Sequence, residues 1–129
     1  MILVDSSVWI DYFNGRRSRE TDLLDDLLGS EVLVTGDLIL TEVLQGFAND
    51  RDFRRARRAL EILAFEPMVG HDIAVASAIN YRRLRARGIT VRKTIDVIIA
   101  TFCAATGHDL LHADRDFAAM AEPLGLRVL

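Results

Sequence analysis

The chain reads TIDVIIATFC from Thr94 to Cys103, an almost unbroken apolar run. A helix that is apolar nearly all the way round lies in the middle of a domain rather than on its surface. Shorter runs of β-branched residues and leucine recur on both sides of it, at residues 2–4, 32–35, 67–69, 110–112 and 126–129. Such runs alternating with helical segments predict an α/β fold.

Helical periodicity fills the intervals between these five runs. The segments that carry it are residues 6–13, 19–28, 37–48, 50–64, 71–87, 95–106 and 115–121. Parallel strands need connections of a dozen or more residues, and right-handed helical crossovers supply that length. We therefore expect a five-stranded parallel sheet covered on both faces, in a three-layer α/β/α sandwich.

Length and composition set limits on the class of protein. The chain has 129 residues, half of them hydrophobic, which suits one domain spanning residues 1–129. Its formal net charge is -3, so it is not a uniformly basic protein that coats nucleic acid by bulk charge. Any nucleic-acid binding must be confined to a local surface.

The sequence carries no sign of a membrane or export segment. Its longest apolar stretch, residues 97–105, falls short of the roughly 18 residues that a membrane-spanning helix needs. The start, MILVD, lacks the basic flank and long apolar run of a secretory signal. The single cysteine, Cys103, cannot form an intramolecular disulfide and is expected to pack as a small hydrophobe. We expect a cytoplasmic protein.

Two carboxylates lie among apolar neighbours. Asp96 shares a helix face with Ile99 and Cys103. A buried carboxylate must be paired, protonated or bound to metal, although an Asp in a first helical turn also gains from the helix dipole. Glu42 lies in LILTEVLQGF, where Gly46 one turn further on suggests a close approach to the backbone. Glu42 is alternatively a partly exposed residue of an amphipathic helix.

Two further acids follow predicted strands. Asp5 comes directly after residues 2–4, and Asp114 follows residues 110–112. Each has a simpler explanation as the N-cap of the next helix. In an open parallel sheet, however, ligands bind outside the carboxyl ends of the strands, where the strand order reverses. If the first and fourth strands are neighbours, Asp5 and Asp114 meet in one crevice, and the start of the helix bearing Asp96 can reach it.

Carboxylates that converge on one crevice repel one another unless a cation shares them. Oxygen ligands suit Mg²⁺ or Mn²⁺, and the chain has no Cys or His cluster with zinc spacing. A Walker-type phosphate loop and a Gly-rich dinucleotide fingerprint are also absent. The acids therefore predict a magnesium or manganese site.

A basic stripe follows residue 50. Its members are Arg51, Arg54, Arg55 and Arg58, at helical spacing. A second cluster contains Arg82, Arg83, Arg85, Arg87, Arg92 and Lys93. Arginine pairs with phosphate in a bidentate way, which makes the stripe a candidate RNA-binding surface, although a solvated helix face explains it equally well.

Taken together, these residues resemble a PIN-domain ribonuclease, and more narrowly a VapC-type toxin of a toxin-antitoxin pair. The motifs that carry the resemblance are Asp5-Ser6-Ser7, Thr41-Glu42-Val43-Leu44-Gln45-Gly46, Thr94-Ile95-Asp96-Val97-Ile98-Ile99-Ala100 and Asp114-Arg115-Asp116-Phe117. They occur in family order and cover the chain from Asp5 to Phe117. One departure is His112, where many relatives carry Thr or Ser.

The resemblance implies a sheet order of 3-2-1-4-5 and an acidic site for RNA hydrolysis. By this likeness, Mg²⁺ (or Mn²⁺) is held by Asp5, Asp96 and Asp114, with Asp116 as an outer member. Glu42 places a second ion or the attacking water, and Ser6 orients a carboxylate or a water. It also implies inhibition of translation and growth, a VapB-like antitoxin and a homodimer.

Two alternatives remain open at this point. The closer one is a PIN nuclease of RNA processing that has no antitoxin. The other is a receiver-type signalling domain, which is also an α/β domain of about this length with an acidic pocket. A receiver carries its phosphorylated Asp after the third strand, where this chain reads Met68-Val69-Gly70-His71.

Overall fold

The computed structural model describes residues 1–129 as four strands and seven helices. The strands are β1 (Ile2–Val4), β2 (Leu33–Gly36), β3 (Ala64–Glu66) and β4 (Asp109–Leu111). The helices are α1 (Ser6–Phe13), α2 (Arg19–Leu27), α3 (Asp37–Leu44), α4 (Asp50–Glu61), α5 (Gly70–Ala86), α6 (Thr94–Thr106) and α7 (Arg115–Leu124). Strands and helices alternate as the sequence predicts.

The sheet is parallel, with the order β3-β2-β1-β4. Leu3 of β1 pairs with Val34 of β2 on one side and with Leu110 of β4 on the other. All three side chains are fully buried or nearly so, because helices cover both faces of a parallel sheet. The predicted order 3-2-1-4 is confirmed, and β1 and β4 are neighbours.

The prediction of a fifth strand, at residues 126–129, is wrong. Residues 126–129 run beside β4 but form only one isolated bridge, between Leu110 and Val128. Two backbone hydrogen bonds hold them there, from Leu110 N–H to Arg127 O and from Leu129 N–H to Leu110 O. A strand ladder needs pairing at successive residues. Here both hydrogen bonds involve the same residue of β4, Leu110, through its N–H and its carbonyl oxygen. The sheet therefore has four strands.

The third strand lies three residues earlier than the sequence suggests, at Ala64–Glu66 instead of residues 67–69. Pro67 has no N–H to donate, so it ends the ladder. The next N–H, that of Met68, is donated to Asp37 Oδ1 at 3.1 Å instead. The Met68 side chain also passes very close to Gly36. Glycine allows this approach, because a Cβ at position 36 would lie 2.4 Å from Met68 Cγ.

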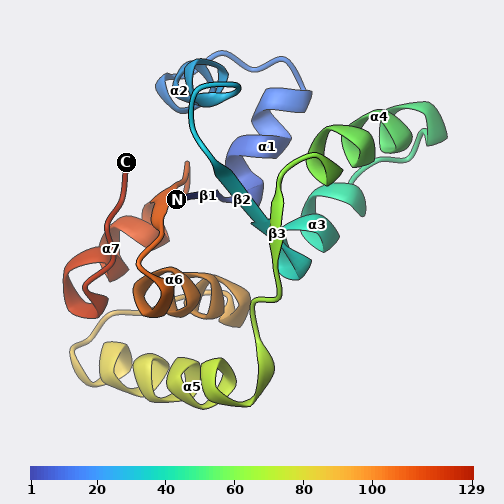
Figure 1. Cartoon of the computed structure of the whole chain (residues 1–129). Helices are drawn as coiled ribbons and strands as arrows, with labels where there is room; N and C mark the ends of the chain where they lie inside the picture. The colour runs from blue at the N-terminus through green and yellow to red at the C-terminus, as the bar shows by residue number, and fades with distance from the viewer.

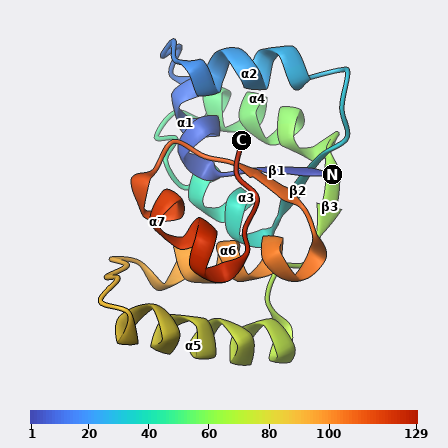
Figure 2. The ribbon, with the colours of Figure 1, turned by 90° about the vertical axis from the view of Figure 1, so that its left-hand side faces the viewer.

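Figures 1 and 2 show the helices in two layers, with α1 to α4 on one side of the sheet and α5 to α7 on the other. The chain moves from β1 to β2 to β3 in one direction and then returns past β1 to β4. Right-handed crossovers made in opposite directions cover opposite faces, which produces the three layers.

Helix α6 lies between the sheet and α5 (Figure 1). Its buried residues are Asp96, Val97, Ile99, Ala100, Thr101, Phe102 and Cys103. The apolar run quoted above is therefore the central helix, as its composition predicts. None of the seven helices combines the length and the hydropathy of a membrane-spanning segment.

Candidate active site

The carboxyl ends of β1 and β4 bring Asp5 and Asp114 to the same edge of the sheet. The backbone N–H of Asp5 donates to Leu111 O at 2.9 Å, which joins the two strand ends directly. Each Asp also caps the helix that follows it: Asp5 Oδ2 accepts from Ser7 N–H and Asp114 Oδ1 from Asp116 N–H. The cap and the proposed site use the same side chains, so the two explanations do not exclude each other.

Asp96, Asp114 and Asp116 converge. One carboxylate oxygen from each lies within 4.8 Å of the others. Oxygens bound to one Mg²⁺ at about 2.1 Å lie no more than about 4.2 Å apart, so small side-chain rotations suffice to close this set around an ion. Asp96 is 6% exposed, whereas the carboxylates of Asp114 and Asp116 reach solvent. An ion bound here is accessible from outside.

Asp5 lies outside that set of mutually close oxygens, but it has an unsatisfied oxygen of its own. Its Oδ2 accepts from both the backbone and the hydroxyl of Ser7, at 3.0 and 2.5 Å. Its Oδ1 is buried without a partner, and so is Asp96 Oδ2. Buried polar atoms without a partner are costly, and an ion or water bound at the site would satisfy these two oxygens. An all-oxygen donor set with two such atoms fits Mg²⁺ or Mn²⁺.

Burial raises the pKa values of Asp96 and Asp5. Burial, together with the charges of Asp5, Asp114 and Glu42, raises the pKa of Asp96 to about 7. Burial also raises the pKa of Asp5, against the hydrogen bonds from Ser7. Bringing a cation to these carboxylates removes the repulsion, so the site gains more from a metal than isolated surface acids do.

Glu42 extends the acidic site from α3. Its pKa is raised by burial and by the Asp5 charge, while a hydrogen bond from Ser6 and the Lys93 charge act in the opposite direction. Ser6 Oγ donates to Glu42 Oε1 at 2.9 Å. The interpretation of Gly46 is wrong: α3 ends at Leu44, and Gly46 lies beyond the helix, exposed and without a crowding neighbour.

The sequence patterns include two residues, Ser7 and Arg92, without assigning either a role at the site. The Ser7 hydroxyl accepts from Ala113 N–H at 3.2 Å while it donates to Asp5, so it ties the segment after β4 to β1. Arg92 lies against Asp116, with Nε 3.3 Å from Oδ2. A hydroxyl next to a strand-end acid was the available signal for Ser7, whereas Arg92 is one arginine of a dispersed cluster.

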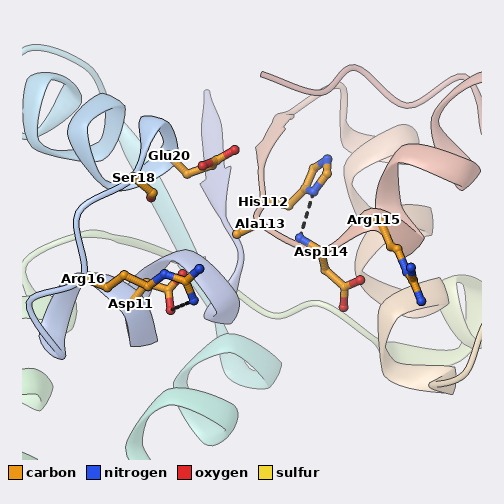
Figure 3. Close-up of a pocket in the computed structure, with 8 residues that line it drawn as sticks. All are labelled: Asp11, Arg16, Ser18, Glu20, His112, Ala113, Asp114 and Arg115. Atoms are coloured by element: carbon orange, nitrogen blue, oxygen red, sulfur yellow. Dashed lines mark hydrogen bonds and ion pairs between the residues drawn. The ribbon is translucent and has the colours of Figure 1, made fainter.

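A pocket of about 320 Å³ opens beside Asp114. Figure 3 shows it between the segment after α1 and the segment after β4. It is lined by Asp11, Arg16, Ser18, Glu20, His112, Ala113, Asp114 and Arg115. Burial lowers the pKa of His112, which keeps its imidazole neutral at pH 7. The acidic site therefore adjoins a polar pocket lined by both signs of charge.

The basic stripe is not brought to the acidic site. Its four arginines, Arg51, Arg54, Arg55 and Arg58, are exposed on α4. In Figures 1 and 2, α4 belongs to the layer across the sheet from α7, which follows Asp114. Arg55 lines a separate pocket with Phe13 and Phe47. Contact between the stripe and RNA would need a strand that extends well beyond the acids.

Comparison with known proteins gives the family. The model of the PIN domain matches residues 2–123. The chain is 31% identical to the VapC ribonuclease Mb1587 of Mycobacterium bovis and to ribonuclease VapC11 of Mycobacterium tuberculosis, over 98% of this chain and 96% of each relative. It superposes on a toxin-antitoxin complex from Klebsiella pneumoniae with a TM-score of 0.76 at 23% identity, covering 100% of this chain and 96% of that one.

The receiver-type alternative is therefore wrong, and the resemblance drawn from the four acidic motifs is confirmed at the level of the family. The chain belongs to the PIN domain family.

Proposed function

We propose that the protein is a metal-dependent endoribonuclease that acts as the toxin of a VapBC-type toxin-antitoxin pair. One observation carries the proposal: Asp96, Asp114 and Asp116 place oxygens within 4.8 Å of one another at the strand ends of a PIN domain. The names of the relatives, VapC ribonucleases, support RNA as the substrate.

Asp96, Asp114 and Asp116 would hold the ion, and Asp5 lies close enough for its charge to raise the pKa of Asp96. When bound, Mg²⁺ or Mn²⁺ supplies an activated water and neutralises charge on the scissile phosphate. Ser7 keeps Asp5 in place through Oδ2. No side chain needs to form a covalent bond with the substrate.

Glu42 orients the attacking water. Ser6 occupies its Oε1, which leaves Oε2 to accept the proton of that water. The raised pKa of Glu42 makes it a stronger base than an ordinary surface carboxylate. Products leave by the solvent-facing side of the site, where Asp114 lines the open pocket.

The partners follow from the same likeness. We propose an RNA substrate, a VapB-like antitoxin that covers the site, and a homodimer, within a single domain of residues 1–129. Similarity to VapC ribonucleases over nearly the whole chain favours the toxin over an RNA-processing nuclease without an antitoxin. Co-purification with the product of a small neighbouring gene separates the two.

The activity is tested with purified protein and total RNA, with Mg²⁺, with Mn²⁺ and with a chelator. We expect cleavage with either ion, loss of cleavage on chelation and recovery when metal is restored in excess. Asp96→Asn serves as the matched control, because it replaces one carboxylate oxygen by an amide NH₂ group at nearly constant side-chain volume. Cleavage by the parent that survives exhaustive chelation contradicts the metal mechanism.

A further inference from the structure

Arg92 lies across two of the three carboxylates that form the candidate metal site. Its Nε is 3.3 Å from Asp116 Oδ2, and its Nη2 is 3.9 Å from Asp114 Oδ1. No other basic side chain forms an ion pair with Asp96, Asp114 or Asp116. The residue lies on the segment between α5 and α6, outside both helices. Its guanidinium is thus the cation that Asp114 and Asp116 share within the chain.

The ion pairs of Arg92 with Asp114 and Asp116 cost little free energy to break. The Arg92 side chain is 63% exposed, and an exposed ion pair contributes little to stability. A divalent ion at the same carboxylates carries twice the charge at a shorter distance and takes up the oxygen lone pairs that the guanidinium uses. Metal binding and the Arg92 ion pair therefore compete.

The released guanidinium stays beside the site. Val91, the preceding residue, is 5% exposed and belongs to the hydrophobic core, so it anchors the backbone at this point. A planar guanidinium matches two oxygens of a phosphate, which a compact ammonium group does not. The nearest phosphates available to it are those of a nucleic-acid strand that enters the metal site.

We propose that Arg92 is a phosphate-positioning residue that metal binding releases. Without metal it neutralises Asp114 and Asp116; with metal bound it turns to a phosphodiester of single-stranded RNA next to the scissile one. This inference rests on the proposed function for its RNA step only. It links the two ligands: the metal makes the arginine available, and the arginine strengthens RNA binding.

Arg87 offers a matched control. It is exposed to a similar degree, with a side-chain exposure of 53%, and it pairs with Glu122 Oε2 at 3.2 Å. Glu122 belongs to α7, as Asp116 does, but it is not among the site acids. Arg87→Gln therefore removes the same charge and the same kind of ion pair without touching the candidate metal site. Thermal melts of each variant check that the fold is retained.

The first measurement is a calorimetric titration of chelator-stripped protein with Mn²⁺, in the absence of RNA. We expect Arg92→Gln to bind Mn²⁺ roughly two- to fivefold more tightly than the parent, the factor that corresponds to the loss of one exposed competing ion pair. Arg87→Gln should match the parent. Equal affinities for Arg92→Gln and Arg87→Gln overturn the competition.

The second measurement is the binding of a fluorescent single-stranded RNA oligonucleotide, with a chelator or with Ca²⁺ as an oxygen-binding ion; gels confirm that the RNA stays intact. With the chelator, Arg92→Gln and Arg87→Gln should bind alike. With Ca²⁺, Arg92→Gln should bind more weakly than Arg87→Gln, and its salt slope should fall by about 0.7, the value for one phosphate of a single strand. Arg92→Lys should restore only part of the affinity.

An equal loss of RNA affinity with and without Ca²⁺, or no loss beyond that of Arg87→Gln, overturns the release of Arg92 toward RNA. The proposed function is tested by a different measurement, the cleavage assay. It is wrong if the parent protein cleaves no RNA with Mg²⁺ or with Mn²⁺. The Mn²⁺ titration does not depend on cleavage, so it supports or overturns the competition in either case.

Discussion

The Ser6 hydroxyl donates a 2.9 Å hydrogen bond to Glu42 Oε1 and joins the start of α1 to α3 across 36 residues of sequence. Ser6 is buried, while Glu42 is partly exposed. The bond therefore ties a partly exposed carboxylate to a buried hydroxyl. It restrains the rotation of the Glu42 carboxylate, whose charge contributes to the raised pKa of Asp96.

Ser6→Ala should lower the cleavage rate with little effect on metal affinity. Without the hydroxyl, Glu42 loses its fixed orientation, and we expect kcat to fall by roughly tenfold, less than the loss of a complete general base. Mn²⁺ affinity should stay the same, because Asp96, Asp114 and Asp116 are unchanged. Ser30→Ala is the control, since the Ser30 hydroxyl contacts only the backbone of α2. A parallel loss of Mn²⁺ affinity would assign Ser6 to the metal site instead.

Asp96→Asn should abolish cleavage without destabilising the metal-free fold. It removes one of several crowded charges, so we expect an equal or higher melting temperature in chelator, with each kcal/mol equivalent to roughly 4 °C for a chain of this size. Mg²⁺ at about 100 times its dissociation constant should stabilise the parent by about 2.7 kcal/mol and the variant much less. Thermal melts with and without Mg²⁺ measure both effects. Unfolding of the metal-free variant would make Asp96 a structural cap.

In the metal-free protein, the stability that Asp96 contributes should be lost as the pH rises from 4 to above 7. The pKa of Asp96 lies at about 7 in the folded chain, raised from 3.8, so folding favours its protonated form. Its contribution is fully present below about pH 4 and is lost as the pH rises through 7. Burial raises the pKa of Asp5 as well, which acts in the same direction.

Melting temperatures in chelator across this pH range, for the parent and for Asp96→Asn, measure the difference that Asp96 makes. The parent should lose more stability on raising the pH than the variant. Saturating Mg²⁺ should remove the difference in slope or reverse it, because the ion binds the deprotonated carboxylates. Identical pH profiles in chelator would show that Asp96 does not titrate in this range.

The stripe on α4 should contribute to RNA binding only for strands long enough to pass from Asp96, Asp114 and Asp116 to the layer that contains α4. Replacing Arg54 and Arg58 with Gln should then reduce the salt slope by up to about 1.4 for a long single strand, at about 0.7 for each phosphate that is no longer bound. The slope should not change for a short oligonucleotide. Arg57→Gln is the control, because Arg57 is paired with Glu61 at 2.7 Å on the same helix. A slope that is unchanged for the long strand would assign the stripe to solubility.

Local patterns were sufficient for much of the fold. The apolar run from Ile95 to Cys103 predicted a central helix, because a helix without a polar face is stable only when other elements cover it. The short buried runs of β1, β2 and β4 predicted parallel strands for the same reason. Buried acids such as Asp96 stood out because their neighbours are apolar, and burial of a charge is costly anywhere in a chain.

Local patterns misplaced the elements at the edges of the sheet. At β3 they favoured residues 67–69, yet the strand is Ala64–Glu66, whose first two residues are exposed and carry no burial signal. Residues 126–129 have the composition of a strand but form a single bridge. At an edge, pairing depends on which backbone groups of the neighbouring strand are still free, and composition does not record this.

By itself, the sequence determined the α/β class, the buried central helix, the strands β1, β2 and β4 to within a residue, and the presence of acids where burial disfavours them. Only the tertiary structure decided which side chains meet: Ser6 with Glu42, Asp96 with Asp114 and Asp116, and Arg92 with Asp116. Burial and helical period are properties of neighbouring residues, so a sequence reports them directly. A contact between residues far apart in the chain depends instead on strand order and on the packing of two helical layers, and these are settled only when the whole chain has folded.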